Sequence, residues 1–228
     1  MALVGLYILA YLLGAVPFGY LVGLSKGIDI TKTGSGNIGA TNAYRALGRT
    51  AGLSVFALDV AKGAVCPLLV RYFVGPINSL SHVEAMNHAV LLGVAAVLGH
   101  SFSPFLRFKG GKGVATGLGA ILGTAPVVGL VGFGVFLLVV LISRIVSVSS
   151  ILGSASVVVA AVVTKQPPLL IWVYGLVVTF VIVRHVPNMK RFFRGEEKRF
   201  DFKKKKPTEP DKSDESYEPD QSERGADK

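Results

Sequence analysis

The stretch "VATGLGAILGTAPVVGLVGFGVFLLVVLIS", residues 114–143, is apolar from end to end and carries no charged side chain. About 20 apolar residues are enough for a helix to cross a bilayer, so this stretch is too long for one crossing and short for two. Pro126 disfavours helical backbone at Ala125. We therefore predict a short helix over Gly113–Thr124 and a longer one over Pro126–Ser143. At about 1.5 Å per residue, the short helix would span only about 18 Å and could not cross unshielded.

Working outward, the rest of the chain has the same apolar character, with 51% hydrophobic residues overall. Lipid leaves backbone groups no water to bond, so spans must be helices or closed barrels, and no run of alternating polarity typical of barrel strands is present. The sequence predicts an all-α polytopic membrane protein. The further apolar runs are Leu3–Leu24, Ala51–Val74, Ala89–Leu106, Ser149–Thr164 and Leu169–Val183.

Charge predicts how these helices are oriented. Residues 1–195 carry a net charge of +12 and residues 196–228 a net charge of −2. Cytoplasmic loops are rich in Lys and Arg, which places Lys26–Arg49, Arg107–Gly113 and the stretch from Arg184 on the cytoplasmic side. This gives about seven transmembrane helices, one of them short, with the N-terminus outside and the C-terminus cytoplasmic. A five-pass core with residues 113–143 as a re-entrant hairpin gives the same sidedness and is the alternative.

The chain divides into two parts of different composition. Residues 1–200 hold all the apolar runs and form the predicted membrane domain. Residues 201–228 are charged, contain proline and have almost no apolar side chains, so we expect a disordered cytoplasmic tail. The basic excess has no basic–aromatic soluble domain beside it, which argues against nucleic acid as a partner.

The first polar motif is "TGSGNIGATN", Thr33–Asn42, which follows the first apolar run. Glycines allow backbone angles that leave N–H groups free to converge on an anion. Neutral donors and the cation of Arg45 add to this, although a glycine loop packed between helices is the alternative. The predicted substrate-binding residues here are Gly34, Gly36, Asn37, Thr41, Asn42 and Arg45.

The second motif is "GHSFSPFLRFKGGKGVATG", residues 99–117. Two lysines flank a glycine pair directly before the predicted short helix, and a helix N-terminus attracts phosphate through its free N–H groups and its dipole. The motif is not a P-loop, because Gly113 stands where Ser or Thr must follow the lysine. The predicted anion-binding residues are Lys109, Gly110, Gly111, Lys112 and Gly113.

The third motif is "RHVPNMKRFFRGEEKRF", residues 184–200. Arg184, Asn188 and Arg191 follow the i, i+4, i+7 spacing of one helical face. Within the second apolar run, Asp59 and Lys62 are one turn apart, and we expect a buried ion pair there. Histidines are few and scattered, so we expect no metal site.

Taken together, residues 3–200 resemble the bacterial membrane family of acyl-phosphate-dependent glycerol-3-phosphate acyltransferases. The motifs that carry the resemblance are Gly34–Arg45 with Leu58–Gly63 behind it, Gly99–Gly117, and Arg184–Lys198. The resemblance implies transfer of a fatty acyl group from acyl phosphate to the sn-1 hydroxyl of glycerol 3-phosphate, giving lysophosphatidic acid and phosphate for phospholipid synthesis. It also implies a multi-pass protein of the bacterial inner membrane, with its site facing the cytoplasm and without a cofactor. We expect a monomer.

Roles within the three motifs follow as hypotheses. Arg45, Lys109 and the Ser35–Asn42 loop would hold glycerol 3-phosphate, and Gly110–Gly113 would hold acyl phosphate. The proton of the attacking hydroxyl would go to His185 or to an oxygen of the acyl phosphate, and an acyl-enzyme through a serine is a further alternative. The expected catalytic residues are His185, Asn188, Ser147 and Ser35; the expected supporting residues are Asp59, Lys62 and Glu197.

Two other functions fit an integral membrane protein. A transporter of a phosphorylated solute would place polar residues through the bundle to its outer face, and few are found there. A non-catalytic scaffold for lipid enzymes would leave the glycine and lysine motifs unexplained.

Overall fold

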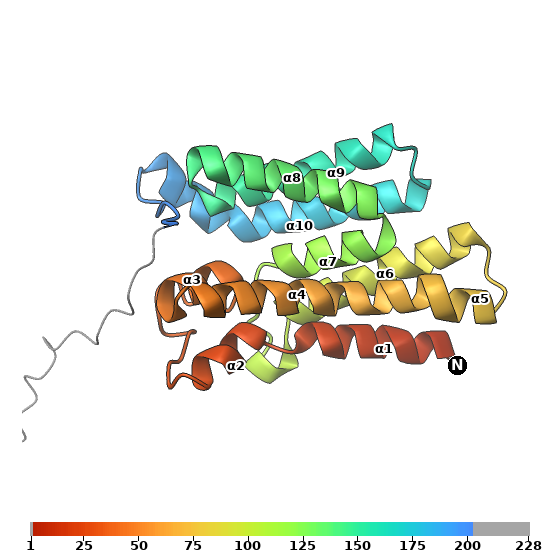
Figure 1. Cartoon of the computed structure of the whole chain (residues 1–228), viewed down its shortest axis with the longest axis horizontal. Helices are drawn as coiled ribbons and strands as arrows, with labels where there is room; N and C mark the ends of the chain where they lie inside the picture. The colour runs from red at the N-terminus through yellow and green to blue at the C-terminus, as the bar shows by residue number, and fades with distance from the viewer. Residues whose placement is uncertain (1, 203–228) are drawn as a thin grey trace, which may run out of the picture.

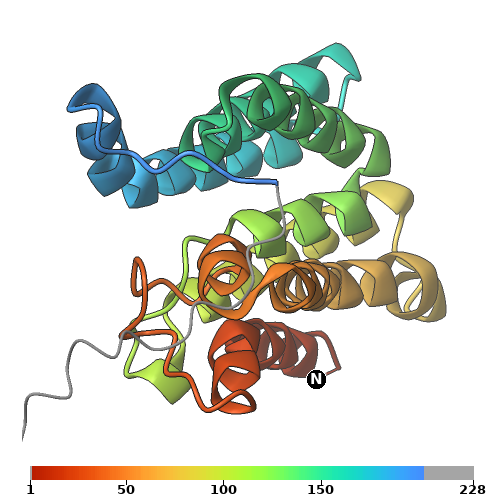
Figure 2. The ribbon, with the colours of Figure 1, turned by 60° about the vertical axis from the view of Figure 1, so that its left-hand side comes forward.

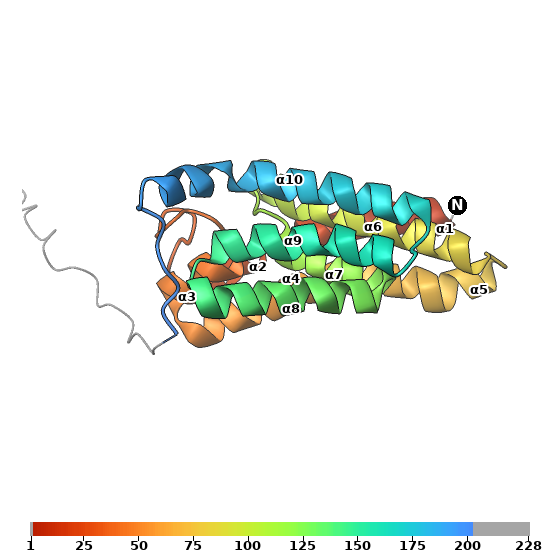
Figure 3. The ribbon, with the colours of Figure 1, turned by 90° about the horizontal axis from the view of Figure 1, so that it is seen from above.

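The computed structural model describes residues 2–202, and within this range the chain is helical with no strand. The long helices run side by side along one axis, and the described chain begins and ends at opposite ends of the bundle (Figures 1 and 3). The α-helices are α1 (Ala2–Ala15), α2 (Phe18–Leu24), α3 (Ala40–Leu47), α4 (Arg49–Leu69), α5 (Gly75–Ile77), α6 (His82–Ser101), α7 (Val114–Thr124), α8 (Pro126–Ser143), α9 (Val146–Val163) and α10 (Pro168–Phe193). A π-helical turn, η1 (Val70–Val74), joins α4 to α5, and a 3₁₀ turn, η2 (Pro104–Leu106), follows α6.

Five of these helical segments are long and apolar enough to cross a membrane. They are Arg49–Ile77, His82–Leu106, Pro126–Ser143, Val146–Val163 and Pro168–Phe193; α1 and α2 together make a sixth if they count as one bent span. The predicted break at Ala125-Pro126 is confirmed, because α7 ends at Thr124 and α8 begins at Pro126. Seven passes would require α7 to count as one, and both that number and the sidedness stay predictions.

Several helix boundaries differ from the predicted apolar runs; α10, for example, continues to Phe193, beyond the predicted Val183. The first apolar run is not one helix: α1 and α2 meet at a 41° bend at Val16 and Pro17, because proline cannot continue the hydrogen-bond ladder. The third long helix, α6, begins at His82, well before the predicted Ala89. Its start is fixed by a capping box in which Ser81 and Glu84 bond each other's backbone N–H groups.

Small residues set the closest contacts between helices. An added Cβ at Gly63 of α4 would lie 2.0 Å from the Thr116 carbonyl oxygen, and one at Gly119 of α7 would lie 1.9 Å from the Val60 carbonyl oxygen. The backbones of α4 and α7 therefore touch along this interface, as small residues allow in membrane bundles.

The helices form two groups, with α8, α9 and α10 lying together beside the group that contains α1 to α7 (Figure 2). Residues 194–202, which we call the C-terminal strap, leave α10 and run between the two groups (Figure 2). Phe200 packs its ring on Tyr44 of α3 at 4.6 Å between centroids, and its N–H bonds the Arg144 carbonyl oxygen at 2.5 Å. The predicted disordered tail lies, beyond Phe202, outside the described residues.

Candidate active site

The first glycine loop is built around Asn42. Gly34 and Gly36 adopt positive φ angles of 65° and 68°, which fold the chain back over the start of α3. The buried Asn42 carboxamide fills the loop: its Oδ1 accepts the Ser35 N–H at 3.0 Å. Its Nδ2 donates to the carbonyl oxygens of Ile30, Thr33 and Asn37 at 3.2, 3.0 and 2.9 Å. The polar atoms of Asn42 therefore hold the loop, and substrate binding by Asn42 stays a prediction.

The remaining residues of this loop differ in exposure. Ser35 is exposed, and Asn37 and Thr41 are half-buried. The Asn37 side chain accepts the Gly39 N–H at 2.8 Å, so part of its capacity is also used inside the loop. Arg45 is exposed one turn further along α3 and donates from Nη2 to the Lys198 carbonyl oxygen at 3.0 Å, which joins the first motif to the strap.

The second motif folds against the end of α6. The N–H groups of Gly110 and Gly111 donate to the carbonyl oxygens of Ser101 and His100, both at 3.1 Å. An added Cβ would lie 2.0 Å from the His100 oxygen at Gly110 and 2.1 Å from His100 Nε2 at Gly111. These two glycines are thus required for close approach, and both amides are bonded to α6; the role of Gly110 and Gly111 in phosphate binding stays a prediction.

Arg184 ties this glycine pair to α10. Its Nη2 donates to the carbonyl oxygens of Gly110 and Gly111 at 3.1 and 2.8 Å. This role of Arg184 was not predicted, although its spacing put it on one helical face with Asn188 and Arg191. An arginine at the end of an otherwise apolar helix run was the available signal, because such a cation needs partners of its own.

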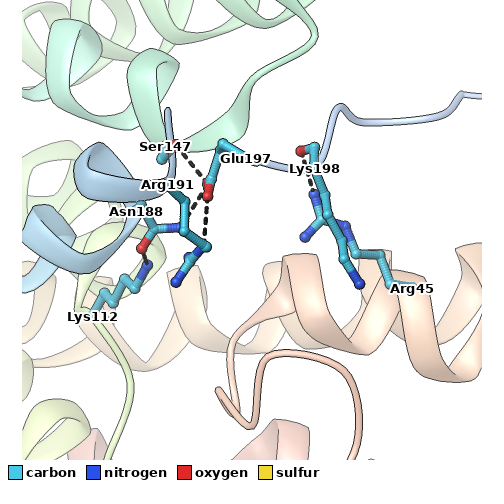
Figure 4. Close-up of polar contacts among 7 residues, drawn as sticks. All are labelled: Arg45, Lys112, Ser147, Asn188, Arg191, Glu197 and Lys198. Carbon is cyan, nitrogen blue, oxygen red and sulfur yellow. Dashed lines mark hydrogen bonds and ion pairs between the residues drawn. The ribbon is translucent and has the colours of Figure 1, made fainter. Parts of the chain in front are cut away.

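The centre of the site is a network between the second and third motifs (Figure 4). Lys112 Nζ donates to Asn188 Oδ1, and Asn188 Nδ2 donates to Glu197 Oε1 at 2.7 Å. The same Oε1 accepts the Ser147 hydroxyl at 2.8 Å, while Oε2 accepts Arg191 Nε at 2.9 Å. Glu197, predicted as a supporting residue, thus joins Ser147, Asn188 and Arg191.

The charges around this network favour an anion. Partial burial lowers the pKa of Lys112 to about 8; Glu197 acts against this shift, and Arg191, Arg184 and Arg45 add to it. Burial raises the pKa of Glu197, but hydrogen bonds from Asn188, Ser147 and Arg191 outweigh it and leave that pKa below its ordinary value. Several cations thus surround one ionised carboxylate, and a bound phosphate would relieve their mutual repulsion.

His185 lies one turn before Asn188 on α10 and is buried. Its Nδ1 is 2.8 Å from the Val181 carbonyl oxygen. A carbonyl oxygen only accepts, so Nδ1 carries the proton and Nε2 presents its lone pair. This tautomer is the one that a general base at Nε2 requires.

Beneath the site, the expected ion pair is present in α4. Lys62 Nζ lies 2.8 Å from Asp59 Oδ1, and both side chains are buried. Lys62 also donates to the Val16 carbonyl oxygen at 2.8 Å, which lies at the break between α1 and α2 and accepts the Phe18 N–H as well. His100 Nδ1 is 3.8 Å from the same Asp59 oxygen, which connects this pair to the second motif.

Two predicted residues fall at the edge of this arrangement. Gly113 adopts a φ of 80° and is the N-cap of α7, directly after Lys112. Lys109 is exposed, and the hydrogen bonds of Figure 4 do not include it. Among the described residues, no group of three His, Cys, Asp or Glu side chains could hold a metal ion.

An apolar groove begins at Gly113 and runs along α7 between α8, α9 and α10. Val181, whose carbonyl oxygen holds His185, also lines it. Its wall is almost entirely apolar and includes Val114, Leu118, Ile121, Phe133, Phe136 and Val177. The polar network and a lipophilic channel therefore share one border.

The model of one known family, glycerol-3-phosphate acyltransferase, matches residues 4–195, which include most of the three motifs. The chain belongs to the glycerol-3-phosphate acyltransferase family. A relative of that name from Synechococcus elongatus is 44% identical over 203 residues, covering 87% of this chain and 95% of its own length. One from Geobacter sulfurreducens is 41% identical, covering 84% and 94%.

A solved member of the acyltransferase family has the same architecture. The crystal structure of PlsY (YgiH), an integral membrane glycerol 3-phosphate acyltransferase in its glycerol 3-phosphate form, is 37% identical and superposes with a TM-score of 0.80. The superposed region covers 88% of this chain and 96% of the PlsY chain. A second form of PlsY, with lysophosphatidic acid, has a TM-score of 0.78. Glu197, at the centre of the network here, lies just beyond the range that the acyltransferase family model matches.

Proposed function

We propose that this chain transfers a fatty acyl group from acyl phosphate to the sn-1 hydroxyl of glycerol 3-phosphate, giving lysophosphatidic acid and phosphate. The observation that carries the proposal is the shared border of a cationic network and an apolar groove at Lys112 and Gly113. A reaction that joins a phosphate-bearing headgroup to a fatty chain needs both environments in contact. The relatives' names and the two forms of PlsY support the same substrate class.

The acyl phosphate lies with its chain in the groove and its phosphate at the groove mouth. Gly113, the N-cap of α7, lines the groove, and Lys112 directly precedes it, so a cation and the helix dipole both favour an anion there. Transfer of the chain from lipid to the groove exposes no apolar surface to water.

Glycerol 3-phosphate enters from the exposed side of the network. The Arg45 guanidinium donates one hydrogen bond to a neutral carbonyl oxygen of the strap. A phosphate dianion is a far stronger acceptor for this guanidinium. The exposed Ser35 and the half-buried Thr41 add hydroxyl groups next to that position. Binding would exchange the Arg45–Lys198 hydrogen bond for a charged one.

In the chemical step, the sn-1 oxygen attacks the acyl carbon, the bond from that carbon to the phosphate oxygen breaks, and inorganic phosphate leaves. The hydroxyl proton goes to His185 Nε2 or to an oxygen of the departing phosphate. Acyl phosphate is a mixed anhydride, so the leaving group needs little activation, and positioning and charge stabilisation supply the rate. Asn188 orients the groups from between Lys112 and Glu197.

Supporting residues hold this geometry without touching the reacting atoms. Glu197 fixes Asn188, Ser147 and Arg191 at once, and the Asp59–Lys62 pair braces the break beneath the site. We place the site at the cytoplasmic face of the bacterial inner membrane, from the basic loops at this end, and we propose that a monomer suffices because all three motifs come from one chain.

A direct assay tests the proposal. Purified protein in lipid nanodiscs receives acyl phosphate and radiolabelled glycerol 3-phosphate, and the organic phase is examined for labelled lysophosphatidic acid while released phosphate is counted. Equal amounts of both products are expected, with far less product when acyl-CoA replaces acyl phosphate. Uptake of glycerol 3-phosphate into sealed vesicles without acylation would favour a transporter instead.

The base is identified by a pH–rate profile on His185→Ala. If the variant no longer loses activity at low pH and its kcat falls strongly, His185 accepts the proton of the sn-1 hydroxyl. A maximal rate near that of the wild type assigns it to the substrate phosphate.

A further inference from the structure

Arg71 bonds the end of the short helix α7 that lies farthest from the site. Its Nη1 donates to the carbonyl oxygens of Gly123 and Thr124 at 3.3 and 2.7 Å. These are the last two residues of α7. The last four carbonyls of any helix have no partner within it, and lipid offers none.

The depth of this helix end makes the contact important. Helix α7 has 11 residues and is about 16 Å long. Its turn into α8 lies well short of the end of the bundle that α4, η1 and α5 reach (Figure 1). The free carbonyls of Gly123 and Thr124 therefore end inside the bundle, where a protein donor must replace water.

The half-buried Arg71 side chain extends across to the end of α7. Long basic side chains in a membrane helix normally extend to the nearest aqueous interface. About 30 Å of helix separate Arg71 from Arg49, the first residue of α4. The side chain reaches α7, with its guanidinium 5.2 Å from the ring centre of Tyr72. The cation at the negative end of the α7 dipole adds to the two hydrogen bonds.

The interface between α4 and α7 gives few other means of fixing α7 along its axis. Backbone meets backbone at Gly63 and Gly119, and an added Cβ at Gly123 would lie 2.9 Å from Pro67 Cβ. Small residues of this kind let the two backbones approach closely and so set the distance between the helices. At the far end of α7, Arg71 supplies two directional hydrogen bonds from the neighbouring helical segment.

We propose that Arg71 is a positioning residue for acyl transfer, because it sets the axial position of α7 and thereby of Lys112 and Gly113 at the other end of the helix. The inference rests on the function proposed above. A shift of α7 by about 1 Å would move the phosphate-binding end by the same amount, and misplacement on that scale can reduce a rate about a hundredfold.

The test compares Arg71→Leu, Arg71→Gln and Arg71→Lys with Ser81→Ala in nanodiscs. Ser81→Ala is the matched control, since it removes a helix cap at the same end of the bundle, from α6, without touching α7. We expect Arg71→Leu to lower kcat at least about tenfold and to raise the KM for acyl phosphate. Arg71→Lys should restore part of both, and the control should change only the melting temperature.

Hydrogen exchange at residues 113–117 supplies a readout that does not need activity. Faster exchange there in Arg71→Gln, but not in Ser81→Ala, supports long-range positioning. Equal exchange at 113–117 with unchanged KM values, or kcat losses that only follow the folded fraction, would overturn it. If the wild-type protein made no lysophosphatidic acid, the proposed function would fail, whereas the exchange result would still decide the role of Arg71.

Discussion

The two glycine-rich segments of the site use glycine for different reasons. In the loop Gly34–Gly39, glycine supplies backbone angles, and a single side chain, Asn42, holds the resulting shape. In the segment Gly110–Gly113, two glycines supply space, and the backbone of α6 with Arg184 holds the chain. The first loop therefore depends on the Asn42 side chain, which a substitution can remove. The second segment depends on the absence of a Cβ atom at Gly110 and Gly111.

The largest effect is expected where space is the requirement. Gly110→Ala would place a methyl group 2.0 Å from a backbone oxygen of α6, which cannot move without shifting that helix. We expect acyltransferase activity to fall more than about a hundredfold, because the displaced segment carries Lys112. Gly175→Ala, in α10 where an added Cβ meets nothing within 4 Å, is the control and should retain activity. An active Gly110→Ala enzyme would contradict the role of close approach.

The Asn42 contacts give the next largest effect. Asn42→Ala removes one acceptor and the donor of three hydrogen bonds from a buried position. Each lost buried bond costs about 1 kcal/mol, so we expect the loop to open and the KM for glycerol 3-phosphate to rise about tenfold or more. Asn42→Asp keeps the acceptor for the Ser35 N–H and loses the donor. Substrate kinetics measure the change in KM, and limited proteolysis between residues 31 and 42 measures the opening of the loop. Identical kinetics in Asn42→Ala and wild type would show that the loop needs no side chain to hold it.

Backbone angle can be separated from crowding within the first loop. Gly34→Ala combines a positive φ with a Cβ 2.4 Å from Asn42 Oδ1, whereas Gly27→Ala has a φ of 70° and open space around it. Gly27→Ala should lower the free energy of unfolding by about 1 kcal/mol and leave the kinetics unchanged. Gly34→Ala should cost more and also raise the KM for glycerol 3-phosphate. Equal losses in the two variants would mean that strain alone matters at Gly34.

The same contrast explains how far the sequence could be read. Apolar runs, the break at Pro126 and the helical spacing of Arg184, Asn188 and Arg191 depend on local rules, and the structure confirms the helices and brings Asn188 and Arg191 together at Glu197. Which polar group holds a loop and which faces the substrate depends on contacts between segments far apart in the chain. The role of Asn42 in holding the first loop could therefore not be predicted from its sequence neighbours.

Some of these long-range roles left a signal in the sequence. Asn42 lies four residues after Ile38 and beside Ala43, on the face of α3 that packs inward. Ser81 and Glu84 have the spacing of a capping box. Nothing local distinguishes the amides of Gly110 and Gly111, which bond α6, from free amides that could bind phosphate. Only the close approach of α6, a property of the packed bundle, decides between the two.

The smallest effect concerns charge within the second segment. With a pKa of about 8, Lys112 is cationic at pH 7 and mostly neutral at pH 9. Phosphate binding that needs this cation must weaken as the pH rises through 8, so the KM for acyl phosphate should increase about fivefold to tenfold between pH 7 and pH 9. Arginine stays protonated over this range, so in Lys112→Arg the KM for acyl phosphate should depend little on pH. We expect this variant to bind acyl phosphate less well at pH 7, because the planar guanidinium does not fit the contact with Asn188. The KM for glycerol 3-phosphate serves as the internal reference. If that KM rises instead while the KM for acyl phosphate stays level, Lys112 serves the acceptor phosphate, and the two glycine segments have exchanged the substrates assigned to them.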